Sequence, residues 1–415
     1  MAPGYREIEV SFTINPKQSF PIGTLAEKEN SIYFEYHQGW LDRGLELSPF
    51  TLLCKPGLIK HTNHGFGPIF GLFDDSLPDG WGLLLMDRFF RKQEIDLAKV
   101  TVLDRLLYLG RETMGALTYH PPTFNKEETK HKIDLHCLAE EAKNVFEGKV
   151  KDILPELMKA GGSPGGARPK ILVGYNRNND VILSGEGELG DDFEHWIIKF
   201  SARKDSRDAG PVEYAYSLMA REAGIEMEKT KLFETAEGDQ FFGVKRFDRS
   251  PNNVRHHIHT FGNLIHANFR IPSCDYGDLL KVVNLLTKDH VQLKKAYRLM
   301  CFNILANNRD DHAKNFSFRL DDESGQWHLA PAYDLTFSRG PGGEHTTTVS
   351  GEGRQPTILH CLQLAKEAGI SPREAKDIYY NVENAVSYWL DFANQVGVRE
   401  EVSDEIESFL AKNIS

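Results

Sequence analysis

The chain has 415 residues, 40% of them hydrophobic and 26% charged, a composition typical of an ordinary globular protein with enough core for two or three domains. The formal net charge of -11 disfavours a stand-alone nucleic-acid binder. No apolar run approaches the roughly 18 residues of a membrane helix, and the first residues lack the features of a signal peptide. Five cysteines without a Cys-x-x-Cys pair argue against a zinc site and predict a cytoplasmic protein that has no membrane partner.

Residues 1–122 are predicted to form a mixed α/β amino-terminal subdomain. Period-two alternation indicates strands, and three-to-four-residue spacing of apolar side chains indicates helices. The expected strands are Ser31–Tyr36 and Pro49–Leu53, and the expected helices are Gly80–Phe90 and Val100–Leu109. Two consecutive prolines, Pro121 and Pro122, precede a charged run and mark the boundary of this subdomain.

Residues 123–247 follow a different pattern, in which a Gly-rich run precedes a small sheet. The expected elements are a helix at Leu135–Met158, the Gly-rich run Gly161–Lys170, strands at Ile171–Tyr175 and His195–Phe200, a helix at Val212–Ala223, and strands at Thr230–Thr235 and Phe241–Phe247. Gly224 is expected to close the second helix, because glycine tolerates the left-handed conformation that ends many helices.

Residues 248–415 are predicted to be mostly helical, with helices at Asp289–Asn307 and Pro372–Ala393 and a polar, Gly-rich segment at Arg339–Arg354. A Gly-rich loop and small sheet followed by a helical region is the linear order of a bilobal protein kinase. The predicted fold class is therefore α+β: a protein-kinase-like fold with an additional α/β amino-terminal subdomain and a mostly helical carboxy-terminal lobe.

Asp310 and Asn315 lie five positions apart, just after the helix predicted at Asp289–Asn307. Asp334 follows a short apolar stretch that contains a proline. In protein kinases a catalytic-loop Asp accepts the proton of the substrate hydroxyl, and an Asn five residues later and a further Asp hold Mg²⁺. Oxygen ligands suit Mg²⁺ because it is a hard ion. The adjacent Asp311 and His312 would also suit a metal-dependent nuclease, but no second carboxylate–histidine cluster supports that alternative.

The Gly-rich run lacks side chains that would keep a phosphate away from backbone N–H groups, so it could cradle one. It is not a Walker A motif, because no Gly-Lys-Ser/Thr sequence ends it. Read alone, such a run is more often a flexible surface loop. Ser163 carries its only hydroxyl and is a candidate phosphorylation site. Lys170 could reach a phosphate, although a solvated lysine is the ordinary alternative.

Lys199 lies at the end of the apolar strand Trp196–Ile198. A lone lysine in an apolar strand of this lobe suits a cation that reaches the nucleotide phosphates, whereas strand alternation alone would place it on a solvated face. Glu213, early in the next predicted helix, could pair with Lys199, but an acid in a first turn is also favoured by the helix dipole. The histidines at 61, 64, 256, 257 and 259 lack acidic or cysteine partners in sequence, so we expect them at the surface.

The motifs together resemble the HipA family, the serine/threonine kinase toxins of bacterial toxin–antitoxin systems. The segments that carry the resemblance are Gly44–Leu45 through Met114–Leu117, Gly166–Lys170, Val244–Arg249, Asp310–Asn315 and Ala332–Asp334. The resemblance covers most of the chain.

The resemblance implies a role for each motif in binding ATP and Mg²⁺. Asp310 would be the catalytic base, and Asn315 and Asp334 would hold the metal. The nucleotide loop would consist of Gly165, Gly166, Ala167, Arg168, Pro169 and Lys170, and Lys199 would contact the phosphates. The backbone of Lys245, Arg246 and Phe247 would hold adenine. Further nucleotide contacts would come from His312, Lys314 and Tyr333. Ser163 would be the autophosphorylation site, where added negative charge would eject the loop and silence the kinase.

The resemblance also implies a partner and a substrate. A helix-turn-helix antitoxin, HipB-like, would neutralise the toxin and carry the complex to operator DNA, and the substrate would belong to the translation machinery, such as an aminoacyl-tRNA synthetase. Two alternatives stay open: a related kinase of a small molecule or other non-toxin substrate, and a non-catalytic co-repressor that only binds the antitoxin.

Overall fold

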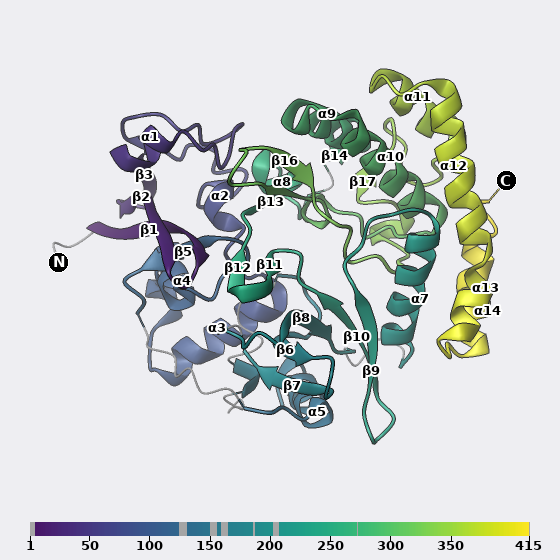
Figure 1. The fold of residues 1–415 in the computed structure, drawn as a ribbon, viewed down its shortest axis with the longest axis horizontal. Coiled ribbons are helices and arrows are strands. Elements are labelled where there is room, and N and C mark those ends of the chain that lie inside the picture. The colour runs from purple at the N-terminus through teal and green to yellow at the C-terminus, as the bar shows by residue number, and fades with distance from the viewer. Residues whose placement is uncertain are drawn as a thin grey trace.

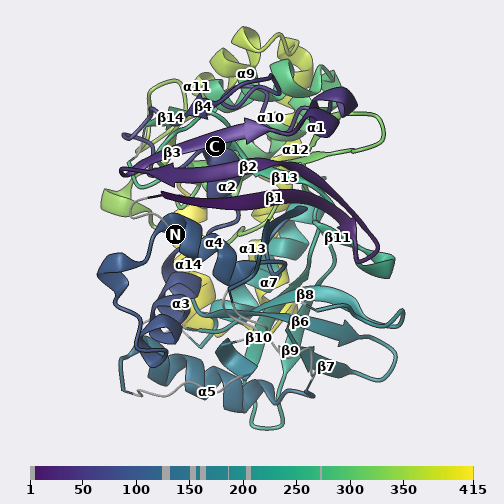
Figure 2. The same ribbon diagram turned by 90° about the vertical axis from the view of Figure 1, so that its left-hand side faces the viewer.

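A computed structural model describes residues 5–123, 131–149, 156–158, 165–185, 187–201, 207–271 and 273–414. The predicted α+β class is confirmed: two five-stranded sheets lie beside a large helical region (Figure 1). The long strands of the first sheet lie above the second sheet in the view of Figure 2. No helix among the described residues is long and apolar enough to cross a membrane.

The first sheet has the order β4-β3-β2-β1-β5 and is antiparallel throughout. Its strands are β1 (Tyr5–Asn15), β2 (Gln18–Lys28), β3 (Ser31–Tyr36), β4 (Ile59–Lys60) and β5 (Leu117–His120). The helices of this part are α1 (Gln38–Arg43), α2 (Gly71–Asp74), α3 (Gly80–Lys92), the short η1 (Leu97–Lys99) and α4 (Val102–Leu109). α4 begins at a capping box, in which Thr101 and Asp104 each bond the other's backbone N–H.

The strand predicted at Pro49–Leu53 is wrong. These residues form a turn in which the Ser48 carbonyl accepts hydrogen bonds from the N–H groups of Thr51 and Leu52. Leu52 is buried in the core, but the apolar side chains of Phe50 and Leu53 are exposed, so the run lacks the alternating burial of a strand.

The second sheet has the order β7-β6-β8-β10-β9, again antiparallel. Its strands are β6 (Lys170–Asn176), β7 (Val181–Ser184), β8 (Glu194–Lys199), β9 (Thr230–Glu234) and β10 (Gln240–Lys245), and its helices are α5 (Leu135–Phe146) and α7 (Ala209–Glu222). α5 begins where predicted, but it ends at Phe146, twelve residues before the predicted Met158, and residues 156–158 are helical again. Gly148 has a positive φ of 73°, which glycine adopts without strain and which ends the helical run.

The carboxy-terminal part is mostly helical, as predicted. Its helices are α8 (Phe261–Leu264), α9 (Tyr276–Thr287), α10 (His290–Leu305), α11 (Ile358–Glu367), α12 (Pro372–Ser387), α13 (Trp389–Gln395) and α14 (Glu400–Leu410), with short turns η2 (Pro251–Asn253), η3 (Ala313–Asn315) and η4 (Pro341–Gly343). The predicted helix Pro372–Ala393 is two helices, because the chain breaks at Tyr388. α7 of the sheet part packs against α12 and α13 (Figure 1).

Short strand pairs hold the loops of this part. They are β11 (Arg249–Ser250) with β12 (Val254–Arg255), β13 (Ile258–Thr260) with β15 (Ser317–Leu320) and β16 (Trp327–Leu329), and β14 (Cys274–Asp275) with β17 (Thr347–Thr348). The last pair is parallel and ties the segment after Asp334 to the start of α9.

The amino-terminal part shares its hydrophobic core with the carboxy-terminal helices. Phe12 and Phe34 of the first sheet belong to one buried cluster with Phe302 and Trp389. The second sheet has a separate core, and Trp81 and Leu85 of α3 belong to it. The amino-terminal part therefore packs against both the second sheet and the helical region.

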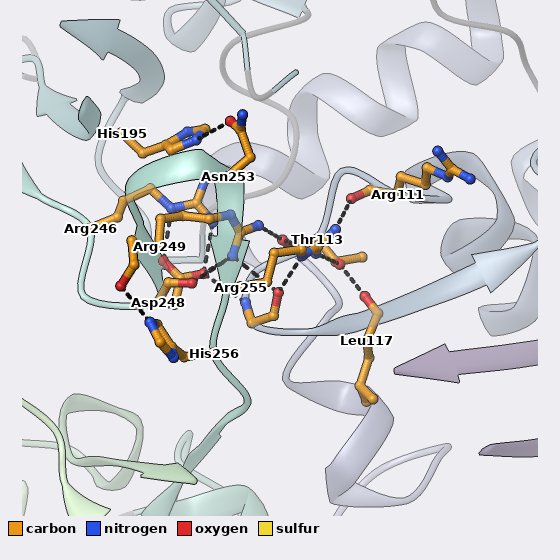
Figure 3. Close-up of polar contacts among 12 residues, drawn as sticks. Arg111, Thr113, Leu117, His195, Arg246, Asp248, Arg249, Asn253, Arg255 and His256 are labelled. Atoms are coloured by element: carbon orange, nitrogen blue, oxygen red, sulfur yellow. Dashed lines mark hydrogen bonds and ion pairs between the residues drawn. The ribbon is translucent and has the colours of Figure 1, made fainter. Parts of the chain in front are cut away.

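A buried ionic cluster joins the first sheet to the end of β10 (Figure 3). The Asp248 carboxylate accepts hydrogen bonds from Arg246 Nε and Nη2 at 2.9 and 2.8 Å, from Arg249 Nη1 at 2.7 Å and from the Gly115 N–H at 2.7 Å. Burial raises the pKa of Asp248, but the two guanidinium groups outweigh it and hold the pKa well below its usual range.

Backbone carbonyls of residues 111–115 complete this cluster. Arg255 donates to the carbonyls of Arg111, Thr113 and Gly115 at 2.8, 3.0 and 2.9 Å, and Arg249 Nη2 donates to the Thr113 carbonyl at 2.7 Å (Figure 3). The loop after α4 is thus bound to the chain that follows β10 by charge-assisted hydrogen bonds.

The prediction of surface histidines is wrong for His61, His257 and His259, which are buried. Burial is possible because each ring has polar partners. His257 Nε2 lies 3.1 Å from the Leu47 carbonyl, and His259 contacts the Asp75 carboxylate through Nδ1 at 2.5 Å and Ser48 through Nε2 at 3.1 Å. These contacts join parts of the chain about 200 residues apart, so local sequence does not indicate them.

Candidate active site

Lys199 is the cation at the centre of the site. Its ammonium forms ion pairs with Glu213 of α7 and with Asp334, which follows β16. The pairing of Lys199 with Glu213 considered from the sequence is therefore present. Lys199 ends β8, and α7 packs on β10 beside it, so one sheet and one helix place the two side chains together.

Lys199 stabilises the charge of both acids in this triad, whereas burial and the neighbouring Asp334 raise the pKa of Glu213. Burial lowers the pKa of Lys199, but the carboxylates of Asp334 and Glu213 outweigh that effect and hold it above its usual value. Burial raises the pKa of Asp334, but Lys199 and Lys170 hold it well below its usual range. Asp334 is therefore ionised near neutral pH, as a metal-binding carboxylate must be.

The catalytic loop predicted at Asp310–Asn315 follows α10 and ends in η3. Asn315 Nδ2 donates to the Asp310 carbonyl at 2.7 Å, which closes the loop. The Asp310 side chain is exposed, whereas the adjacent Asp311 is fully buried. Partial desolvation raises the pKa of Asp310, His312 opposes the shift and Asp334 adds to it. A raised pKa makes Asp310 a stronger proton acceptor than an ordinary aspartate.

Three further residues predicted to bind the nucleotide lie around this loop. The Lys314 ammonium is ion-paired with Asp74 of α2 at 2.9 Å. The Tyr333 hydroxyl lies 2.6 Å from both Ser317 Oγ and the Lys314 carbonyl. His312 Nδ1 is buried and has no hydrogen-bond partner among the residues that the structure describes. Tyr333 thus braces the catalytic loop through its hydroxyl.

The described part of the Gly-rich run, Gly165–Lys170, is held by the start of α3. The Gly166 N–H donates to the Asp79 carboxylate, and the Gly166 carbonyl accepts from the Trp81 N–H at 3.1 Å. The Trp81 indole donates to the Lys170 carbonyl at 3.0 Å. Residues 161–164, and with them the predicted phosphorylation site Ser163, lie outside the described residues.

Lys170 and Lys199 are paired residues on the neighbouring strands β6 and β8, so both ammonium groups face the site. Lys170 Nζ donates to the Gly165 carbonyl at 2.6 Å. Burial lowers the pKa of Lys170, Asp334 opposes the shift and Lys199 adds to it. Burial raises the pKa of both Asp310 and Glu213, and the Arg168 guanidinium partly opposes this rise. Ala167 packs on Gly80, and the Pro169 carbonyl accepts from the Phe200 N–H at 2.8 Å.

The chain leaves the second sheet at Lys245, the last residue of β10, and Phe247 then reaches Tyr333 beside the catalytic loop. Lys245 and Arg246 donate their N–H groups to the carbonyls of Lys229 and His195 at 2.9 Å. Among the described residues, the Phe247 N–H has no hydrogen-bond partner, and the Phe247 ring lies 5.6 Å from that of Tyr333. The Arg246 side chain points away into the Asp248 cluster (Figure 3).

Sequence patterns do not indicate Asp74 and Asp79, although both contact the site. Both belong to the amino-terminal part: Asp74 lies 240 residues before its partner Lys314, and Asp79 lies 87 residues before its partner Gly166. Asp79 precedes α3 but makes no side-chain cap there, because its carboxylate accepts from Gly166 instead. Only the packing of the amino-terminal part brings these acids to the site: α2 packs on α8 of the helical region beside Lys314, and the start of α3 meets the nucleotide loop.

Comparisons with known proteins agree with the motifs. The model of the HipA N-terminal domain matches residues 17–120, and that of the HipA-like C-terminal domain matches residues 162–389. A solved structure described as the Shewanella oneidensis MR-1 toxin–antitoxin system HipA, HipB and its operator DNA complex is 17% identical, with a TM-score of 0.72 over 98% of this chain and 95% of that chain. This likeness shows a shared fold.

The Helicobacter pylori proinflammatory kinase CtkA is 14% identical, with a TM-score of 0.33 over 52% of this chain and 92% of that chain. A likeness this low carries no argument about fold or activity. No curated protein sequence matches the chain. Because the C-terminal domain model alone spans more than half of the residues and the N-terminal model covers most of the rest, the chain belongs to the HipA family.

Proposed function

We propose that this chain is an ATP- and Mg²⁺-dependent serine/threonine protein kinase. The observation that carries the proposal is the triad in which Lys199 binds both Glu213 and Asp334. An active protein kinase needs this lysine–glutamate pair and a metal-binding Asp in place together, with a catalytic-loop Asp and Asn nearby. A protein that served only as a scaffold would have no need to bury these charges.

Asp310 is the proposed base. Its exposed carboxylate would accept the proton of a serine or threonine hydroxyl as the hydroxyl oxygen bonds to the γ-phosphorus of ATP. The bond from that phosphorus to the β-bridging oxygen breaks, and ADP leaves. Lys199 and Lys170 would neutralise phosphate charge, and the Phe247 N–H would bind an adenine edge.

Asn315 and Asp334 fit a Mg²⁺ ion. The Asn315 amide nitrogen donates to the Asp310 carbonyl, which leaves the amide oxygen to bind the ion. Asp334 is held in its ionised form. Oxygen donors of this kind are what Mg²⁺ takes in kinase sites, where it neutralises charge on the phosphates. Binding would require Asp334 to share its carboxylate between Lys199 and the ion.

We further propose that the chain is the toxin of a type II toxin–antitoxin system. Membership of the HipA family and the fold shared with a HipA bound to HipB and operator DNA support this. The partner would be a helix-turn-helix antitoxin, and the chain would reach operator DNA only through it. The substrate would be a component of translation such as an aminoacyl-tRNA synthetase, and phosphate on Ser163 would inhibit the kinase by repelling nucleotide.

Three measurements on the wild-type chain test the proposal. Titration calorimetry should show ATP binding that is lost when Mg²⁺ is chelated, and radiolabelled phosphate should pass from ATP to the protein or to casein. Induced expression should arrest growth, and coexpressed antitoxin should restore it. A flat calorimetric trace would favour the non-catalytic co-repressor, whereas phosphate transfer without growth arrest would favour a non-toxin substrate.

Gly80→Ala is expected to weaken binding of Mg²⁺–ATP by about tenfold or more. Gly80 has a φ of +41°, and a Cβ there would lie 2.7 Å from both Ala167 Cα and the Gly166 carbonyl oxygen. The positive φ costs a non-glycine residue about 1–3 kcal/mol, and the close contacts of the new Cβ can be relieved only by displacing the nucleotide loop.

The matched control for this change is Gly39→Ala in α1, where a Cβ meets nothing within 4 Å. Calorimetric titration of both variants with ATP and Mg²⁺ provides the comparison. If Gly80→Ala binds ATP as tightly as Gly39→Ala, the contact with α3 does not position the loop.

A further inference from the structure

Asp311, the neighbour of the proposed base, is fully buried and takes no part in the chemistry above. Its carboxylate accepts hydrogen bonds from the Tyr276 hydroxyl at 2.7 Å and from the N–H groups of Thr346 and Thr347 at 2.8 and 3.3 Å, and it lies 2.8 Å from His345 Nδ1. A buried carboxylate with this many donors fixes the position of every group that it binds.

The contacts extend from Asp311 in both directions. The Tyr276 hydroxyl accepts from Asn303 Nδ2 at 2.9 Å, and Asn303 Oδ1 accepts from Asn308 Nδ2 at 3.0 Å, which reaches α10 and the approach to the catalytic loop. On the other side, the Thr347 hydroxyl donates to the Asp311 carbonyl at 2.5 Å. One buried network therefore joins the catalytic loop to residues 345–347.

Residues 345–347 belong to segment 338–354, which follows Asp334 in the chain. The rest of this segment is also bound by carboxylates and carbonyls. Asp275 accepts from the Thr348 hydroxyl at 2.7 Å and from the Gly351 N–H at 2.8 Å, beside the parallel pairing of β14 with β17. The Arg309 carbonyl accepts from the Thr346 hydroxyl at 3.1 Å.

In protein kinases the segment after the metal-binding Asp is commonly ordered by phosphorylation, because a phosphorylated residue forms new pairs with arginine. Here Thr346 and Thr347 are buried, and the groups that bind residues 345–348 include the carboxylates of Asp311 and Asp275. A phosphate on Thr347 or Thr348 would meet these carboxylates and would have to be desolvated, and the Arg309 guanidinium already donates to the Gly343 carbonyl of the segment.

We propose that Asp311 is a positioning residue that holds segment 338–354 against the catalytic loop, so that this kinase needs no phosphate on the segment to be active. The inference rests on the proposed kinase function. Its structural part, the ordering of the segment by Asp311, does not depend on activity and has its own measurement.

Asp311→Asn is the direct test, because the amide keeps the size of the carboxylate but loses its charge and half of its acceptor capacity. Misplacement of catalytic groups by about 1 Å costs on the order of 100-fold in rate, so kcat for phosphate transfer to casein should fall by about that factor. The affinity for Mg²⁺–ATP should stay within about twofold, since no nucleotide-binding residue is changed. Trypsin should cut faster after Arg339 and Arg354, the basic residues of the segment.

His345→Phe is the second variant, because it keeps a ring of similar size and leaves Asp311 three of its donors. It should show a smaller loss of kcat and a smaller gain in trypsin sensitivity than Asp311→Asn. The matched control is Asp377→Asn, an exposed aspartate of α12 that should behave as wild type. Circular dichroism checks that each variant is folded.

Three outcomes would overturn the inference: full transfer by Asp311→Asn, unchanged cleavage after Arg339 and Arg354 in that variant, or phosphate found on Thr346, Thr347 or Thr348 in an active wild type that phosphatase inactivates. If the wild type neither binds ATP nor transfers phosphate, the proposed function fails. The trypsin comparison then still decides whether Asp311 orders the segment.

Discussion

Asp310→Asn should lower the rate of phosphate transfer from ATP by about 10²–10⁴-fold, the range expected when a general base is removed. Binding of Mg²⁺–ATP should persist, because the Asp310 side chain is exposed and belongs to neither the Lys199–Glu213 pair nor the nucleotide loop. Calorimetry and radiolabelled transfer on the same preparation separate these two quantities.

Asp334→Asn should have a different signature, since it removes a proposed metal ligand and a partner of Lys199. Transfer should fall at least as far as in Asp310→Asn, and the dependence of ATP binding on Mg²⁺ should weaken as well. Asp377→Asn on α12 is the control for the loss of one carboxylate. Transfer at wild-type rates by both Asp310→Asn and Asp334→Asn would rule out the assigned site.

Asp248→Ala should lower the free energy of unfolding by about 3–5 kcal/mol, the cost of removing one partner of a buried ion pair. The Asp248 carboxylate is 1% exposed, and the change removes the acid that pairs with the buried guanidinium groups of both Arg246 and Arg249 (Figure 3). It also breaks the hydrogen bond to the Gly115 N–H, which binds the first sheet to the chain after β10.

Urea unfolding followed by circular dichroism measures this loss as a lower midpoint. The matched control is Asp377→Ala, which removes an aspartate that is 66% exposed from its pair with Arg373. Exposed pairs contribute about 0–1 kcal/mol, so the control should unfold near the wild-type midpoint. Equal midpoints for Asp248→Ala and Asp377→Ala would show that the buried cluster contributes nothing to stability.

Elements with a regular pattern were predictable from the sequence. β3 coincides with the predicted strand Ser31–Tyr36, because side chains of alternating burial define it. The helix predicted at Val212–Ala223 corresponds to α7, and Gly224 follows it with a φ of +75°. The prediction at Pro49–Leu53 failed because apolar composition alone does not distinguish a strand from a turn with exposed apolar side chains.

The order of the motifs along the chain determined the kinase-like interpretation: a Gly-rich loop, Lys199 on a strand, the Asp310–Asn315 spacing and Asp334. These motifs are local, because each of them is defined by a few consecutive residues. They were enough to name the family and to place the proposed catalytic and metal-binding groups.

The spacing to Asn315 had already distinguished Asp310 from Asp311 in the sequence, but only the tertiary structure showed that Asp310 is exposed and that Asp311 is buried among Tyr276, His345 and the 346–347 backbone. It alone brought Asp74 to Lys314 and Asp79 to the nucleotide loop. The reason is physical: a side chain's burial and partners depend on which distant segments pack around it, and residues next to each other in sequence can face opposite environments.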